Sequence, residues 1–315
     1  MPPRSDGSLA ALLLVQRLVE VDARPLKASE YWSLLERFPD PARLLGLDAA
    51  AIAEVGGIGA DEAERIARLL EAAPGFAFQM DDLQQGGIRL VASVDPDYPA
   101  HLRERLGTTA PPVLHVAGDI ALADRQLLGV VGSRDVSPAG AEVVVRAVGQ
   151  AALHDTGVVA GGAEGVDQIA MQAALGAGAA VVGVLADSLL RATRDPDVRR
   201  AISSGRMCLC TPYKPTAGFT VASAMGRNKV VYALSAATFV VAADAERGGT
   251  WAGAVEALRH GSAPVLVWTG PGSAAGNAQL VTHGAHPVST TEALFPLPNP
   301  EDRPTPSPTQ LGLGL

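Results

Sequence analysis

From residue 88 onward, short runs rich in β-branched apolar residues alternate with longer segments whose apolar residues recur at helical spacing. Strands are predicted at 88–93, 113–117, 127–131, 157–160, 180–185, 207–210, 237–242 and 264–268, and helices at 139–154, 165–176, 194–203, 222–234 and 250–260. Strands that are apolar throughout and joined by helices indicate a mostly parallel sheet with helices on both faces. The predicted fold class is therefore α/β and Rossmann-like.

The first 75 residues show helical periodicity instead, with predicted helices at 8–21, 27–37, 41–45, 48–55 and 61–72. The Gly-Gly-Ile-Gly turn at 56–59 is typical of helix-hairpin-helix or SAM-like domains, in which backbone N–H groups can bind a nucleic-acid phosphate. The helix after this turn is acidic, which favours a packing or protein-contact role. We predict a helical domain at 1–75, an α/β domain at 76–290 and a disordered, proline-rich tail at 291–315.

Composition narrows the functional classes. The chain has 315 residues, with 25 basic and 33 acidic side chains, so its formal charge is 25 − 33 = −8. A hydrophobic share of 48% suffices for a core, and the acidic balance argues against a protein that coats duplex DNA by bulk charge. Cys208 and Cys210 are too close and too few for a disulfide or a zinc site. We expect a cytoplasmic protein with no membrane segment and no bound metal.

Glycine-rich loops follow three of the predicted strands, at the edge where parallel sheets bind ligands. The first loop contains Gly132, Ser133 and Arg134; the second contains Gly161, Gly162 and Gly165; and the third contains Gly248, Gly249 and Thr250. Glycine N–H groups, a hydroxyl and a guanidinium can all bind phosphate oxygens. Each loop taken singly can also be a plain turn, with Asp167 capping the helix after the second loop. Three such loops in one sheet favour a phosphate-bearing ligand.

Charge is unevenly distributed. Segment 191–229 holds eight basic and two acidic residues, a net +6, which leaves −14 for the rest of the chain. It contains Lys214 and Lys229, two of the three lysines, together with Tyr213 and Phe219. Basic residues interleaved with aromatic residues are typical of single-stranded nucleic-acid binding, because the rings stack on unpaired bases. The alternative is a solvated basic surface whose aromatic residues lie in the core.

Several motifs also resemble those of the DprA/Smf family. They are Asp-Pro-Asp-Tyr-Pro-x-x-Leu at 95–102, Pro-Pro-Val-Leu at 111–114, Val-Val-Gly-Ser-Arg at 130–134, Ala-Gly-Gly-Ala-Glu-Gly-Val-Asp at 160–167 and Gly-Arg-Asn-Lys-Val-Val at 226–231. Their order and spacing agree with the family over about 88–286. The chain differs from it at Ala170-Met171 and Cys210-Thr211, and a proline-rich segment stands where many members have a winged-helix domain.

The resemblance implies an extended Rossmann fold that binds and protects single-stranded DNA and loads a RecA-type recombinase onto it during natural transformation. It also implies a homodimer, no cofactor and no catalysis. The DNA pocket that the family uses corresponds here to Gly132, Ser133, Arg134, Gly161, Gly162, Gly165, Arg227, Asn228 and Lys229. In this interpretation Arg134, Arg227 and Lys229 contact phosphates, and Lys214 is a further contact.

A second interpretation is a Rossmann protein that binds or senses a small nucleotide, for instance in phage defence. A third is a hydrolase of nucleoside monophosphates, related to the lysine-decarboxylase-like family. The sequence Gly-Gly-Thr at 248–250 followed by Glu256 resembles that family's signature imperfectly, and Glu256 is its one candidate acid–base residue. The six histidines show no metal-binding spacing, and the chain has neither a Gly-x-Ser-x-Gly serine nor a Walker lysine.

Overall fold

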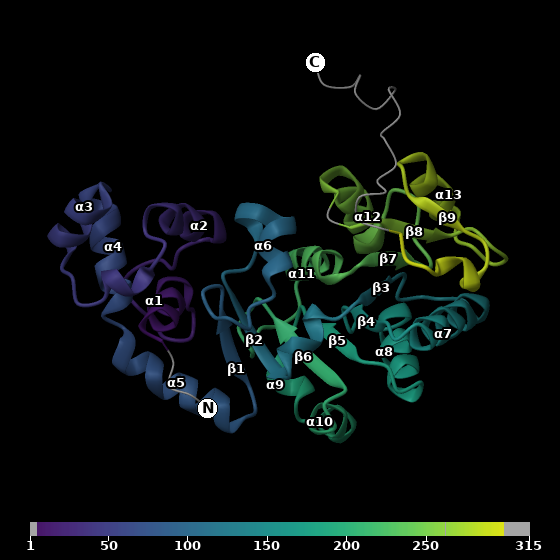
Figure 1. The fold of residues 1–315 in the computed structure, drawn as a ribbon, viewed down its shortest axis with the longest axis horizontal. Coiled ribbons are helices and arrows are strands. Elements are labelled where there is room, and N and C mark those ends of the chain that lie inside the picture. Colours follow the sequence, from purple (N-terminus) through teal and green to yellow (C-terminus); the bar gives the residue numbers. More distant parts are fainter. Residues whose placement is uncertain (1–4, 262, 299–315) are drawn as a thin grey trace, which may run out of the picture.

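The computed structural model describes residues 5–261 and 263–298, and it confirms the α/β Rossmann-like class (Figure 1). Within these ranges nine strands form one sheet: β1 (Arg89–Ala92), β2 (Val113–Gly118), β3 (Leu127–Val131), β4 (Gly157–Ala160), β5 (Val181–Val184), β6 (Met207–Thr211), β7 (Ala237–Val240), β8 (Val265–Trp268) and β9 (His286–Val288). The first eight lie at the predicted positions, with ends shifted by one or two residues. The three-residue strand β9 is too short for periodicity to reveal it.

The strand order is β1-β2-β6-β5-β4-β3-β7-β8-β9. Strands β3 to β9 run parallel, whereas β1 and β2 add antiparallel pairs at one edge. Strands β4, β5 and β6 follow one another on one side of β3, and β7 then lies on the other side of β3. The β3–β7 boundary is therefore the topological switch point, the place where open parallel sheets bind ligands.

Helices cover both faces of the sheet. One face packs against α7 (Pro138–Leu153), α8 (Val166–Gly176), α9 (Leu189–Ala192) and α10 (Pro196–Ser203). The other packs against α6 (Ala100–Leu106), α11 (Val221–Leu234), α12 (Gly248–His260) and α13 (Ala275–Thr282). Successive strand residues alternate between the two cores, since side chains on a strand point to opposite faces in turn.

Five α-helices and a short 3-10 helix form the amino-terminal region: α1 (Asp6–Val15), α2 (Ala28–Arg37), η1 (Pro41–Leu44), α3 (Ala49–Gly56), α4 (Ala60–Leu70) and α5 (Ala73–Gln85). Helix α1 ends six residues before the predicted end, because the side-chain oxygen of Gln16 accepts hydrogen bonds from the N–H groups of Leu18 and Val19. Gly57 adopts the left-handed conformation that joins α3 to α4. Helix α5 was not predicted, and it crosses the boundary placed at residue 75.

The carboxy-terminal boundary also differs from the one placed at residue 290. Residues Thr291–Leu294 form a 3-10 helix, and Leu294 is buried in the core beside α7. The predicted tail beyond residue 298 lies outside the described residues. Cys208 and Cys210 are free thiols buried in β6. In the described ranges we find no helix with the length and apolar character needed to cross a bilayer.

Specific contacts fix the helical region on the β1–β2 edge of the sheet. The indole N–H of Trp32 donates to the carbonyl of Ala110 at 2.8 Å, and the Arg103 guanidinium lies 4.2 Å from the centroid of the Trp32 ring. The hydroxyls of Tyr31 and Ser93 form a hydrogen bond of 2.8 Å. Figure 1 shows the purple and blue helices beside β1, at the opposite end of the sheet from β9. The two regions thus share a packed interface.

We predict that Trp32→Ala lowers the free energy of unfolding by about 3–5 kcal/mol, because it removes a buried aromatic side chain and leaves the Ala110 carbonyl unpaired. Urea denaturation followed by circular dichroism measures this loss. Phe78→Ala is the control, since Phe78 is 73% exposed and its removal should change the stability by less than about 0.5 kcal/mol. Equal stability of the two variants would contradict the packed interface.

Candidate nucleic-acid interface

A cavity of about 430 Å³ opens at the carboxyl ends of β3 and β7, at the topological switch point. Its walls come from the first and third glycine-rich loops, from Ala163 and Asp167 after β4, and from the amino-terminal half of α11. We name it the switch-point pocket. The lining includes Gly132, Ser133, Arg134, Asp167, Phe219, Arg227, Asn228, Arg247, Gly248, Gly249 and Thr250. Residues that are far apart in the sequence therefore meet in one site.

The loop after β3 presents Arg134 at the rim of this pocket. The N–H of Ser133 donates to the carbonyl of Ala242 at 2.9 Å, which ties this loop to the one after β7. The Ser133 hydroxyl accepts from the N–H of Asp135 at 3.2 Å. The exposed Arg134 guanidinium lies 4.8 Å from the centroid of the Phe219 ring, and Phe219 is 49% exposed. A cation and an aromatic face therefore stand side by side at the pocket mouth.

The loop after β4 surrounds a buried ion pair. The Asp167 carboxylate accepts the N–H of Gly161 at 3.0 Å and lies 3.3 Å from the Arg227 guanidinium. A Cβ atom at Gly161 would lie 0.9 Å from that guanidinium, so any larger residue there would displace Arg227 from the ion pair. At Gly165 φ is +81°, and a Cβ would lie 2.4 Å from the carbonyl oxygen of Arg134. The second loop thus packs on the ion pair and on the first loop.

Burial dominates the electrostatics of this pair. It raises the pKa of Asp167 to about 6, although Arg227 and the N–H groups of Ala163 and Gly161 act in the opposite direction. Burial likewise lowers the pKa of Arg227, against the attraction of Asp167. Arg227 is only 4% exposed and also donates to the Val184 carbonyl at 3.4 Å. Its structural contacts are therefore the loop after β4 and the end of β5.

The loop after β7 is held from two sides. The Asn228 amide donates to the carbonyl of Gly249 at 3.2 Å, which links α11 to the start of α12. The fully buried Asn277 accepts from the N–H of Ala243 and donates to the carbonyls of Val241 and Trp268. These bonds fix the backbone that places Arg247 and Gly248 at the pocket.

The structure assembles part of the predicted site. Gly132, Ser133, Arg134, Arg227, Asn228, Gly248, Gly249 and Thr250 line the switch-point pocket. Gly161, Gly162 and Gly165 are not among its lining residues, although Ala163 of the same loop is. Lys214 and Lys229 lie outside this set and line a different cavity, described below. Lys229 forms an ion pair with Glu256 at 2.8 Å, so Glu256 faces α11. Residues 248–250, predicted as a loop, form the first turn of α12 and line the switch-point pocket instead.

The basic segment 191–229 does not form one patch. Arg191 pairs with Asp187, Arg200 pairs with Asp197, and both pairs lie on the α9–α10 side of the sheet. Sequence reasoning gave no contact role to Arg247, although it directly precedes the glycines of the third loop. Asp167 was interpreted as a possible helix cap, and its pairing with Arg227 was missed. No group of metal-binding side chains occurs among the residues that the structure describes.

The fold and site define a class: a Rossmann-like protein with an arginine-bearing pocket at its switch point and a helical domain on one sheet edge. The family model described as DNA recombination-mediator protein A matches residues 89–297. That range is most of the chain and includes the whole sheet, so the chain belongs to this family, as its motifs suggested.

Two solved structures resemble the fold. DNA processing protein A (DprA) from Streptococcus pneumoniae has a TM-score of 0.68 at 22% identity, covering 89% of this chain and 94% of that one. DNA processing protein A from Helicobacter pylori, described for its single-stranded DNA binding mode, has a TM-score of 0.53 at 20% identity. That match covers 66% of this chain and 93% of the other. No curated protein gives a significant match.

We predict that Asp167→Asn changes how stability depends on pH. The folded-state pKa of about 6 lies above the ordinary value of 3.8, so the folded protein binds this proton more tightly. The stability that this proton contributes is complete below pH 3.8 and is lost as the pH rises through 6. Relative to Asp167→Asn, the native protein should lose up to about 3 kcal/mol over this range.

Urea denaturation of both proteins at several pH values measures this difference. Subtracting the two curves cancels the other titrating groups, which the variants share. A constant difference between pH 4 and 7, or one that moves in favour of the native protein, would contradict the raised pKa.

Proposed function

We propose that this chain binds single-stranded DNA at the switch-point pocket. The observation that supports this most is the pair of exposed arginines, Arg134 and Arg247, beside the exposed ring of Phe219. Guanidinium groups bind phosphate oxygens bidentately, and an aromatic face stacks on an unpaired base. Membership of the family described as DNA recombination-mediator protein A supports this choice of ligand.

A single strand fits the pocket better than a duplex does. Stacking on Phe219 requires a base whose face is free, which a duplex does not offer. The acidic net charge of −8 also opposes a long electrostatic footprint on duplex DNA. The Helicobacter pylori relative, whose structure is described for its single-stranded DNA binding mode, supports the same ligand.

Within this proposal the cationic residues have different roles. Arg134 and Arg247 are exposed at the rim and contact phosphates. Arg227 is buried against Asp167 and positions the loop after β4 beneath them. Asn228 positions the third loop through the Gly249 carbonyl.

We further propose that the chain acts as a binding protein rather than as a hydrolase. A nucleotide hydrolase built on the Gly248–Thr250 loop would need its acid–base residue in the same cavity. Glu256, the candidate, is instead bound to Lys229 in another cavity, between α11 and α12. An ion-paired carboxylate that does not face the pocket is poorly placed for proton transfer there.

We predict that Arg134→Gln weakens the binding of fluorescent oligodeoxynucleotides by about 5- to 10-fold, because it removes one phosphate contact. The loss should be similar for all base sequences, and the slope of affinity against salt should fall by about 0.7. Fluorescence anisotropy at several salt concentrations measures both effects. Arg146→Gln, on the exposed side of α7, is the control. Equal affinity of the two variants would rule out Arg134 as a contact.

Finer roles follow from family membership, and we propose them too: protection of the strand, loading of a RecA-type recombinase in transformation, and a homodimer. On DNA covered by single-strand-binding protein, the chain should increase strand exchange by such a recombinase, and Arg134→Gln should reduce the increase. A strand-exchange assay measures this, and sedimentation measures the oligomer. An unchanged exchange rate would contradict the mediator role.

A further inference from the structure

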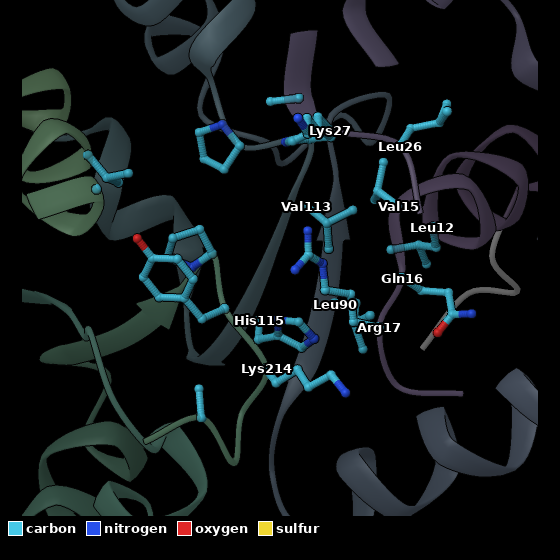
Figure 2. Close-up of a pocket in the computed structure, with 18 of the residues that line it drawn as sticks. Leu12, Val15, Gln16, Arg17, Leu26, Lys27, Leu90, Val113, His115 and Lys214 are labelled. Atoms are coloured by element: carbon cyan, nitrogen blue, oxygen red, sulfur yellow. The ribbon is translucent and has the colours of Figure 1, made fainter. Parts of the chain in front are cut away.

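A second cavity, of about 570 Å³, lies between the helical region and the sheet. We name it the interdomain cleft. One wall comes from the end of α1 and the start of α2, and the other comes from β1, β2 and the loop that leads into α11. Figure 2 shows Arg17, His115 and Lys214 among the side chains that line it.

The cleft gathers positive charge from distant parts of the sequence. All three lysines of the chain, Lys27, Lys214 and Lys229, line it together with Arg17, and its lining includes no carboxylate from residues 5–261 or 263–298. Lys229 is paired with Glu256. In the described part of the chain Arg17, Lys27 and Lys214 form no ion pair, and all three are exposed. Three cations therefore face the cleft without local neutralisation.

The floor of the cleft is mainly apolar and contains one polar side chain. Leu12, Leu26 and Val113 supply apolar surface, and His115 of β2 supplies an imidazole that is 8% exposed. Neither ring nitrogen makes a hydrogen bond of normal geometry, although the backbone of Thr211 and Tyr213 lies close by. Burial lowers the pKa of His115 to about 4, so the ring is neutral at pH 7, and both of its nitrogens are buried in the floor of the cleft.

The segments that present the cations are held in place. The Gln16 side chain accepts the N–H groups of Leu18 and Val19 at 2.7 and 2.9 Å, which fixes the turn containing Arg17. The carbonyl of Pro215 accepts from the N–H of Leu190 at 2.9 Å and from the hydroxyl of Ser188 at 3.1 Å. The loop containing Lys214 is thereby attached to α9. A fixed backbone at these two positions leaves less freedom to be lost when an anion binds.

The cleft lies next to the switch-point pocket. Residues 212–220 connect the two, since Tyr213 and Lys214 line the cleft and Phe219 lines the pocket. Helix α11 separates them, with Lys229 on the side of the cleft and Asn228 on the side of the pocket. A nucleic-acid strand that runs from Phe219 along this loop would reach Lys214.

We propose that the interdomain cleft binds a nucleoside phosphate, which is supplied by the continuation of the single strand held in the switch-point pocket. This rests on the proposed function. Arg17, Lys27 and Lys214 contact the phosphate groups, and the apolar floor around His115 contacts the sugar or base. A free nucleotide offers the same chemistry and is the other source.

The test compares Arg17→Gln, Lys214→Gln and the double variant with the control Arg146→Gln. The probes are oligothymidylates of about 6 and about 24 nucleotides, followed by anisotropy, and thymidine monophosphate, followed by calorimetry. The double variant should bind the long probe about 5- to 10-fold more weakly and the short probe within about twofold of the native protein. Its salt slope with the long probe should fall by about 0.7 for each residue.

Other results have distinct meanings. Weaker binding of thymidine monophosphate alone would support the cleft with a free nucleotide as the source. If the double variant binds all three probes with the same affinity as Arg146→Gln, the proposal that the cleft binds a nucleoside phosphate is overturned. If the native protein binds neither oligothymidylate, the proposed function fails, and the monophosphate measurement alone decides about the cleft. Circular dichroism checks that the exposed substitutions leave the fold intact.

Discussion

The buried ion pair between Asp167 and Arg227 is the interaction on which the candidate site depends. It joins the first turn of α8 to the middle of α11, two helices that pack on opposite faces of the sheet. Two charges in a dry interior lose much of their hydration energy, and attraction alone rarely restores it. Here the carboxylate also accepts the N–H of Gly161, and the guanidinium reaches the Val184 carbonyl. These contacts fix the positions of the Asp167 and Arg227 side chains next to the pocket.

This pair changes which cations are available to a ligand. Arg227 is already committed to a carboxylate, whereas Arg134 stands outside it on a loop that the Gly165 backbone supports. Arg134 also lies near enough to oppose the raised pKa of Asp167. An anion bound at the rim would thus interact first with Arg134 and Arg247, and the buried charges would orient the loops without being exposed to solvent.

Much of the fold could be predicted from the sequence, because the buried parallel strands are apolar along their whole length and the helices between them are periodic. The three glycine-rich loops were found for the same reason, since each follows a strand. The predictions that failed concern tertiary contacts or the side of a helix on which a residue lies. Arg227 and Lys229 are adjacent enough in sequence to suggest one contact surface. Yet 3.6 residues per turn place them on opposite sides of α11, one against Asp167 and one against Glu256.

The distribution of charge along the sequence also failed to predict where charge gathers on the folded protein. Segment 191–229 has a net charge of +6 in sequence, but folding disperses it among the α9–α10 surface, the buried pair and the α11–α12 contact. Conversely, Lys27 belongs to the acidic remainder of the sequence and was not predicted as a contact, because only the docking of the helical region brings it into the cleft that Lys214 also lines. The contacts of Trp32 with Ala110 and Arg103 that hold this docking are therefore also what concentrates positive charge in an acidic protein. Net charge limits the footprint on a nucleic acid, and domain packing decides where that footprint lies.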